Sequence, residues 1–417
     1  MCLPKAVQEE WKTTCKEELE ALHWCNVFEL TDQPRGHKAI GCRWVFDIKS
    51  DGWKKARLVA QGFSQVEGID FDELFSPIVH FESVQLIFAL SAIENYYCVR
   101  VDVHNAYLYG KLDEEIYMRQ PEGFKARGQE NKVIHLQHAL YGLKQAGLAW
   151  WKELNSSMKS LGFECLLSDA GCKDYKEIII AIVYVDDTMF FGKDKAWVDQ
   201  KKKLFMDKWE CRDLGEVKEF LRMCITHSGQ TIHLDQCAYL DKVLKCFSMT
   251  NAKSAPTPLP SNCIPKLAEG KASPELLRSY QSIIGLPLYL MIGTRPDIAY
   301  AVTKLAQFAA NPSQEHLTSA KYICHYLAGT KDYSIVYDGK TAKGIAAYTD
   351  SDWASDPITR QSVTGYFFKS ASGPIMWQSL CKNNSTCFGC LWCLWLSLSC
   401  FGSIWLDVKI WKNAEKS

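Results

Sequence analysis

Two adjacent acids, Asp186 and Asp187, are the residues of this chain whose type and surroundings most directly suggest chemistry. They stand between two apolar runs, Ile178 to Val185 and Met189 to Phe191. Short runs rich in β-branched residues favour buried strands, so the acids would lie at the tip of a hairpin. Two like charges beside apolar strands are costly unless a cation neutralises them. The pair therefore indicates either a divalent-metal site or an ordinary surface turn, in which Asp is common.

A third acid, Asp102, favours the metal site. It stands near the end of another strand-like run, Tyr97 to Val103. Magnesium binds carboxylates together with water and substrate phosphates. Two such ions about 3.5–4 Å apart can clamp the attacking and leaving oxygens of a phosphoryl transfer. This chemistry requires the strand of Asp102 to lie beside the hairpin, which we expect but which local sequence does not establish.

The elements that would position these acids follow from periodicity and turn residues. An amphipathic helix is expected over residues 5–30, an apolar helix over Val84 to Ile93, and a further helix over Lys195 to Trp209. Asp51 and Gly52 separate two strand-like runs and predict a hairpin. Residues 276–330 predict two helices, the second of which begins at Asp297 after Pro296.

Composition limits the classes of function that remain. The 417 residues carry 48 Lys and Arg against 48 Asp and Glu, so no global basic field exists and any grip on nucleic acid must come from a local groove. The length predicts about three domains. The 18 cysteines are scattered, and the charged N-terminal stretch does not resemble a signal peptide. We therefore expect an intracellular, reducing location.

Several motifs together resemble one known family. The stretches at 101–124, 138–150 and 183–187 are similar to the reverse transcriptase region of Pol polyproteins from copia-type LTR retrotransposons. The resemblance continues at 41–79, 213–221, 294–302 and 348–356, in the order of the family, and reaches about Ser379. It implies an RNA-directed DNA polymerase that uses an RNA template, a DNA primer and deoxynucleoside triphosphates. It also implies two Mg²⁺ ions, which Mn²⁺ could replace, and an intracellular setting.

The resemblance also assigns roles to individual residues. Asp102, Asp186 and Asp187 would hold the metals, with the backbone carbonyl of Val103 as a further ligand. The 3′-hydroxyl of the primer would attack the α-phosphate, and pyrophosphate would leave. Other residues would bind the nucleotide, namely Arg57 with Lys55 as second choice at the triphosphate, Tyr107 as selector of deoxynucleotides, and Gly142, Lys144 and Gln145 as positioning residues. From the residues alone, Arg57 fits a solvated edge strand and Tyr107 a buried aromatic equally well.

The implied fold is an α+β right-hand polymerase with fingers, palm and thumb, followed by a helical connection and an incomplete ribonuclease H-like domain. The expected boundaries are 1–250 for the polymerase, 251–275 for a Pro-rich linker, 276–342 for the connection, 343–380 for the partial ribonuclease H-like domain and 381–417 for an aberrant tail.

Departures from the family pattern bear on activity. Ala146, Gly147 and Leu148 replace the usual Ser-Pro-Arg, and Arg222 stands where a Gly is usual and could strain the backbone. Asp350 matches the first metal-binding acid of ribonuclease H, yet no acid occurs between Asp356 and Asp407. We therefore expect the nuclease to be inactive, because one Asp cannot hold a metal pair.

The tail admits three interpretations. Cys387, Cys390 and Cys393 have a spacing found in soft-metal sites, and residues 387–406 are apolar and long enough to span a bilayer. The abrupt change of composition instead favours an out-of-frame or mis-spliced end, so a membrane anchor is not expected.

Two hypotheses for the whole chain thus remain, an active polymerase and a catalytically dead remnant or nucleic-acid-binding scaffold.

Overall fold

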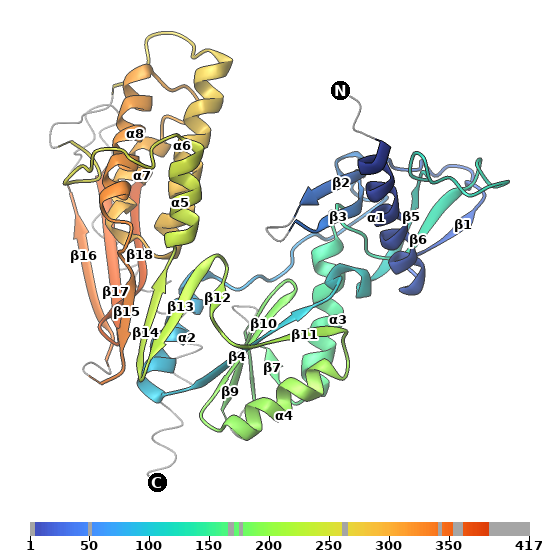
Figure 1. Ribbon diagram of the computed structural model, residues 1–417, viewed down its shortest axis with the longest axis horizontal. Coiled ribbons are helices and arrows are strands. Elements are labelled where there is room, and N and C mark those ends of the chain that lie inside the picture. Colours follow the sequence, from blue (N-terminus) through green and yellow to red (C-terminus); the bar gives the residue numbers. More distant parts are fainter. Residues whose placement is uncertain are drawn as a thin grey trace. The chain divides into compact units, whose positions relative to one another are not determined.

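The structure is a computed structural model that describes residues 5–48, 52–165, 171–174, 178–260, 266–340, 344–352 and 362–382. The chain divides into two compact units, each assembled from separate segments (Figure 1). The first unit comprises Met1–Val79, Arg100–Phe190 and Asp199–Leu214, and the second comprises His80–Val99, Phe191–Val198 and Gly215–Ser417. Helices and strands occur in both, as the α+β expectation requires.

The N-terminal part of the first unit is a helix packed on a two-stranded hairpin. Helix α1 (Lys5–Trp24) packs against β3 (Lys54–Ala60), which pairs antiparallel with β2 (Cys42–Ile48). Gly52 supplies a positive φ of 84° in the predicted turn. The helix predicted through residue 30 ends earlier, because Asn26 has a φ of 50° and the chain then forms a strand.

Because the first helix ends early, the residues after it can join a three-stranded sheet in the order β1-β6-β5. Strand β1 (Phe28–Thr31) pairs with β6 (Val133–His138), which also pairs with β5 (Lys111–Met118). A short 3₁₀ helix, η1 (Gly62–Ser64), follows β3, and another, η2 (Ala106–Tyr109), precedes β5. One apolar core holds this sheet, α1 and β3 together.

The two strands expected to carry the acids are neighbours in a six-stranded sheet. Its order is β11 (Cys211–Glu216), β4 (Tyr97–Val103), β10 (Asp187–Gly192), β9 (Ile179–Tyr184), β8 (Gly171–Asp174) and β7 (Glu164–Cys165). The residues of β9 from Ile179 to Val183 are all buried, as their aliphatic run predicts. The adjacency of β4 and β10, which the metal hypothesis required, is therefore confirmed.

Two helices, α3 and α4, lie between strands of this sheet in the sequence. Helix α3 (Ala146–Ser160) begins at the residues that depart from the family pattern. Helix α4 (Lys195–Met206) ends three residues before the predicted Trp209, and the chain then leads into β11.

Helix α2 (Phe81–Glu94) belongs to the second unit and is buried on almost every side, from Val84 to Ala92. It packs against β14 (Thr231–Asp235), β15 (Ile335–Asp338) and β18 (Gly373–Lys382). The predicted helix over 84–93 is confirmed and begins three residues earlier. Asn95, in a left-handed conformation, ends it.

Four helices share one apolar core in the second unit. They are α5 (Cys237–Cys246), α6 (Pro274–Gly293), α7 (Ala299–Ala306) and α8 (Gln314–Gly329). The prediction of two helices over 276–330 was wrong, because the second one is interrupted. A 3₁₀ turn, η3 (Pro296–Ile298), precedes α7. Ser313 then starts α8 with a capping box, in which its hydroxyl accepts from the His316 amide.

The predicted linker lacks regular structure but does not separate two compact bodies. The described residues 251–260 and 266–273 contain no helix or strand, as expected. However, α5 lies before the linker and α6 to α8 after it, in one core. Strand β14 also pairs with β15 across about a hundred residues of chain. The last boundary between the two compact units falls between Leu214 and Gly215, and the expected domain boundary at the linker stays a prediction.

Two small antiparallel sheets complete the second unit. One has the order β12 (Glu219–Phe220), β13 (Met223–Ser228), β14 and β15. The other has the order β16 (Ala346–Ser351), β17 (Ser362–Ser370) and β18, which confirms the strand-rich prediction for this region.

The tail lies outside the described residues, and with it Cys387, Cys390, Cys393 and the apolar stretch 387–406. Within the part of the chain that the structure describes, every helix is too short or too polar to cross a bilayer.

Candidate active site

A two-residue turn, Val185 and Asp186, joins β9 to β10 and is named the acid turn here. Asp187 is the first residue of β10. Val185 has a φ of 59°. This matches the first position of a type II′ turn, where glycine is usual and a β-branched residue is an outlier. The Val103 amide donates to the Asp186 carbonyl at 2.8 Å. This bond places the end of β4, and with it Asp102, directly beside the turn.

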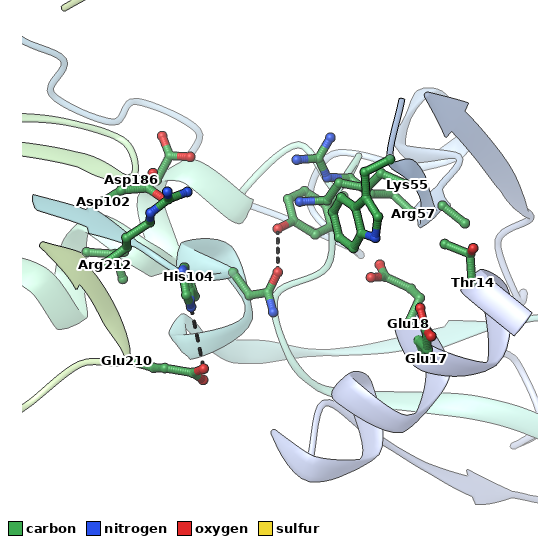
Figure 2. Close-up of a pocket in the computed structure, with 15 residues that line it drawn as sticks. Thr14, Glu17, Glu18, Lys55, Arg57, Asp102, His104, Asp186, Glu210 and Arg212 are labelled. Carbon is green, nitrogen blue, oxygen red and sulfur yellow. Dashed lines mark hydrogen bonds and ion pairs between the residues drawn. The ribbon is translucent and has the colours of Figure 1, made fainter. Parts of the chain in front are cut away.

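Asp102 and Asp186 face the same pocket and influence each other (Figure 2). Asp186 is exposed, yet its pKa is raised, first by partial desolvation among the pocket walls and then by the negative charge of Asp102. Its backbone hydrogen bond and the charges of Arg57 and Arg100 oppose this increase. The two carboxylates therefore create a negative potential that a bound cation would relieve.

Asp187 is held differently, because it is paired with Arg100 of β4. The Nη2 and Nε atoms of Arg100 lie 2.7 and 2.8 Å from Oδ1 of Asp187, and both side chains are about one-fifth exposed. Burial raises the pKa of Asp187, whereas the Arg100 charge and hydrogen bond lower it. One of the three predicted acids thus already has a cationic partner.

The pocket lined by Asp102 and Asp186, the acid pocket, has a volume of about 430 Å³. Figure 2 shows Asp102, Asp186 and Arg212 near one end and Lys55 and Arg57 near the other. With His104 neutral, the lining side chains carry five negative and three positive charges, a net of −2. The negative ones are Glu17, Glu18, Asp102, Asp186 and Glu210, and the positive ones are Lys55, Arg57 and Arg212.

The predicted triphosphate residues lie on β3 at this pocket. The guanidinium of Arg57 stacks over the Tyr141 ring at 5.3 Å. Its Nε atom is buried without a hydrogen-bond partner among the described residues. Glu18 of α1 accepts from the Leu58 amide at 3.3 Å. Its pKa is raised by burial, against the Leu58 hydrogen bond and the charges of Lys55 and Arg57. The Nε–H of Arg57 is therefore a buried donor that stays unsatisfied among the described residues.

Tyr107 is half-buried in η2 and packs edge-on against Tyr141, with ring centroids 5.7 Å apart. Burial and the charge of Asp186 raise its pKa, so the phenol is neutral and close to the acid turn. Its expected role as selector of deoxynucleotides stays a prediction.

Gly142, Lys144 and Gln145 do not line the acid pocket. A Cβ on Gly142 would lie 2.3 Å from the Ala60 carbonyl oxygen, so this glycine allows close approach to β3. The Lys144 ammonium lies 4.5 Å from the Phe71 ring centroid. Gln145 is buried and hydrogen-bonds Gln65 and the Asp70 carbonyl. In this structure these residues organise the loop after β3.

The chemistry of the donor set suits a hard divalent cation, although the structure gathers fewer ligands than predicted. Among the described residues, no group of three or more His, Cys, Asp and Glu side chains is arranged to hold a metal ion. Magnesium, however, is usually held by one or two carboxylates with substrate phosphates and water. Asp102 and Asp186 supply such a pair in a pocket of negative net charge, and Val103 also lines it.

Sequence reasoning missed two residues that organise the turn. Arg100 stands two positions before Asp102, hence on the same face of the strand, and an arginine in an otherwise apolar strand was a usable indication. Trp150 of α3 donates from its indole nitrogen to the Val185 carbonyl at 2.6 Å. No local pattern indicates that contact.

Asp350 lies in β16 on a second pocket of about 420 Å³, within the second unit. Asp352 is the other acid of its described lining, which is otherwise aromatic, aliphatic and uncharged polar, with Tyr348, Val363 and Gln378 among its members. An inactive nuclease stays a prediction.

Comparison with known proteins gives consistent relatives. A sequence profile described as reverse transcriptase (RNA-dependent DNA polymerase) matches residues 25–261. The retrovirus-related Pol polyprotein from transposon TNT 1-94 of Nicotiana tabacum is 38% identical over 87% of this chain and 28% of its own length. That from transposon RE1 of Arabidopsis thaliana is 34% identical over 89% of this chain and 26% of its own length. The chain thus spans little more than a quarter of these relatives.

Among solved structures, a foamy viral protease-reverse transcriptase in complex with double-stranded DNA is similar. It is 14% identical, covers 89% of this chain and 56% of its own, and gives a TM-score of 0.46.

Proposed function

We propose, from the premise that the chain belongs to the reverse transcriptase (RNA-dependent DNA polymerase) family of copia-type Pol polyproteins, that it extends a DNA primer on an RNA template. The observation that carries this proposal is the hydrogen bond between Val103 and Asp186, which joins the strand of Asp102 to the acid turn. The β1–β3 region would form the fingers, the six-stranded sheet the palm, and β13 to α5 the thumb.

In this proposal Asp102, Asp186 and the Val103 carbonyl hold the divalent cations, with Asp187 as a further carboxylate. When bound, two Mg²⁺ ions, or Mn²⁺ in their place, would activate the primer hydroxyl and neutralise the leaving pyrophosphate. They would also change the pocket from a net charge of −2 to about +2, which suits a triphosphate. The protein itself contributes the position and direction of the carboxylates.

The remaining nucleotide contacts come from β3 and η2. Arg57 and Lys55, which both line the pocket, bind triphosphate oxygens, for which a guanidinium fork is well suited. Tyr107 excludes the ribose 2′-hydroxyl from its place beside the acid turn. Gly142, Lys144 and Gln145 act indirectly by fixing the loop after β3, which their contacts with Ala60, Phe71 and Gln65 support.

The decisive experiment is primer extension on an RNA template by the purified chain and by Asp186→Asn. The amide removes the negative charge with little change of shape, so synthesis should be lost. Asp113→Asn is the matched control, because Asp113 is an exposed acid that pairs with Lys152 away from the pocket. Undiminished synthesis by Asp186→Asn would contradict the proposed role.

A second candidate, a catalytically dead scaffold that still binds nucleic acid, is favoured by the Arg100–Asp187 pair. The positive φ of Arg222, 58°, supports it because glycine is expected there. Template–primer binding by the wild-type chain, with no extension in Mg²⁺ or Mn²⁺, would select this alternative.

A further inference from the structure

The acid turn is fastened to the rest of the first unit by two hydrogen bonds. The Val103 amide holds the Asp186 carbonyl at 2.8 Å, and the Trp150 indole holds the Val185 carbonyl at 2.6 Å. The first bond connects neighbouring strands. The second comes from a helix, α3, whose side chain reaches the turn from outside the sheet.

The second bond supports a strained residue. Val185 has a φ of 59°, a left-handed conformation that β-branched residues rarely adopt. Strained backbone persists only where surrounding contacts fix it, and it tends to occur at functional sites. Here the fixing contact is visible, since the strained residue's own carbonyl receives the Trp150 hydrogen bond.

A neighbouring tryptophan offers an internal comparison. Trp150 is buried and packs against Trp209 with ring centroids 5.0 Å apart, and Tyr109 packs against both. The indole nitrogen of Trp209 is also buried but has no hydrogen-bond partner among the described residues. The two rings share one aromatic cluster, and only that of Trp150 is bonded to the turn.

We infer that Trp150 is a positioning residue for the polymerase reaction. Its indole N–H holds Val185 in the left-handed conformation and so directs the adjacent Asp186 carboxylate toward Asp102. This inference rests on the proposed function. The bulk of the cluster stabilises the fold, whereas this single N–H sets the geometry of the turn.

The test compares Trp150→Phe with Trp209→Phe in steady-state primer extension. Each variant keeps an aromatic ring and loses one indole nitrogen. Loss of the Trp150 bond should lower kcat about tenfold, with KM for the nucleotide little changed, because a displaced Asp186 carboxylate affects the chemical step more than nucleotide binding. Trp209→Phe should keep the wild-type kcat, since its nitrogen bonds nothing described. Equal losses in both variants would reduce Trp150 to a packing residue and overturn the inference.

A rescue variant separates positioning from packing. Glycine adopts a positive φ without strain, so Val185→Gly no longer requires the Trp150 bond. In the Val185→Gly background, Trp150→Phe should lower kcat by much less than tenfold. An undiminished tenfold loss there would show that the strained turn is not what Trp150 supports.

Hydrogen exchange provides a readout that does not depend on activity. The Val103 amide reports on the turn because its acceptor is the Asp186 carbonyl. Its exchange should accelerate in Trp150→Phe and stay unchanged in Trp209→Phe. If the wild-type chain shows no synthesis, the proposed function fails, and this exchange comparison still decides the inference. Identical exchange in all three proteins would overturn it.

Discussion

Replacing Arg100 by glutamine should destabilise the protein strongly without divalent cations and weakly with them. Both members of the Arg100–Asp187 pair are about four-fifths covered, and two guanidinium nitrogens lie within 2.8 Å of Oδ1. Removing one partner of a fully buried pair costs about 3–5 kcal/mol, and an exposed pair contributes about 0–1 kcal/mol. The intermediate burial gives about 2 kcal/mol for Arg100→Gln, because Asp187 would lose its counter-charge.

The dependence on metal follows from the geometry. A cation bound beside Asp102 and Asp186 would supply the positive charge that Asp187 loses in the variant. We expect the variant to bind the cation more tightly than the wild type does, because Asp187 no longer has its arginine partner. Since a ligand that binds only the folded state stabilises it, saturating Mg²⁺ should recover at least about half of the lost stability. Urea unfolding in EDTA and in Mg²⁺, followed by circular dichroism, measures both free energies.

The matched control is Lys152→Gln. Lys152 pairs with Asp113 at 2.8 Å, but its side chain is 52% exposed and that of Asp113 is 75% exposed. We expect a change of less than about 1 kcal/mol that does not respond to Mg²⁺. If Arg100→Gln lost the same free energy in EDTA and in Mg²⁺, Asp187 would not share the field of the metal site. The reasoning about this pair would then be refuted.

Three further results are expected. Gly142→Ala should lose at least about 2 kcal/mol more in urea unfolding than Gly128→Ala, because both have positive φ but only the first meets a carbonyl oxygen, at 2.3 Å. Arg222→Gly should be about 1 kcal/mol more stable than Arg222→Ala, because only glycine relieves the φ of 58°; equal stabilities would exclude strain there. In urea unfolding in EDTA, Asp186→Asn should become more stable relative to the wild type as the pH rises. A raised carboxyl pKa stabilises the fold below the unfolded value of about 3.9, and this stabilisation is lost as the pH rises through the folded pKa.

The acids could be predicted from the sequence because they lie at strand ends with clear apolar flanks. Asp102 and Asp186 meet as expected once β4 and β10 pair. Lys144 and Gln145 are expected at the nucleotide, which stays a prediction, and the structure places their side chains beside Phe71 and Gln65. A motif specifies which residues are neighbours in the chain, whereas packing decides which way each side chain points.

The same distinction applies to the fold, in which some features follow from local sequence and others from contacts between distant segments. The hairpin at Gly52, helix α2 and strand β9 each follow from a turn residue or an apolar run that is visible in a short window. The Pro-rich segment after residue 250 correctly indicated a break in regular structure. It could not reveal that α5 packs with α6 to α8, because no local feature records which surfaces meet after the break.

The placement of α2 has a consequence for how the chain emerges from the ribosome. Its apolar residues, Val84 to Ala92, are buried against β14, β15 and β18, and β15 ends at Asp338. At typical synthesis rates of about 5–20 residues per second, roughly 12 to 50 seconds separate the appearance of α2 from that of β15. During this interval a largely apolar helix lacks one of the strands that bury it, so chaperone supply should govern the yield of folded protein.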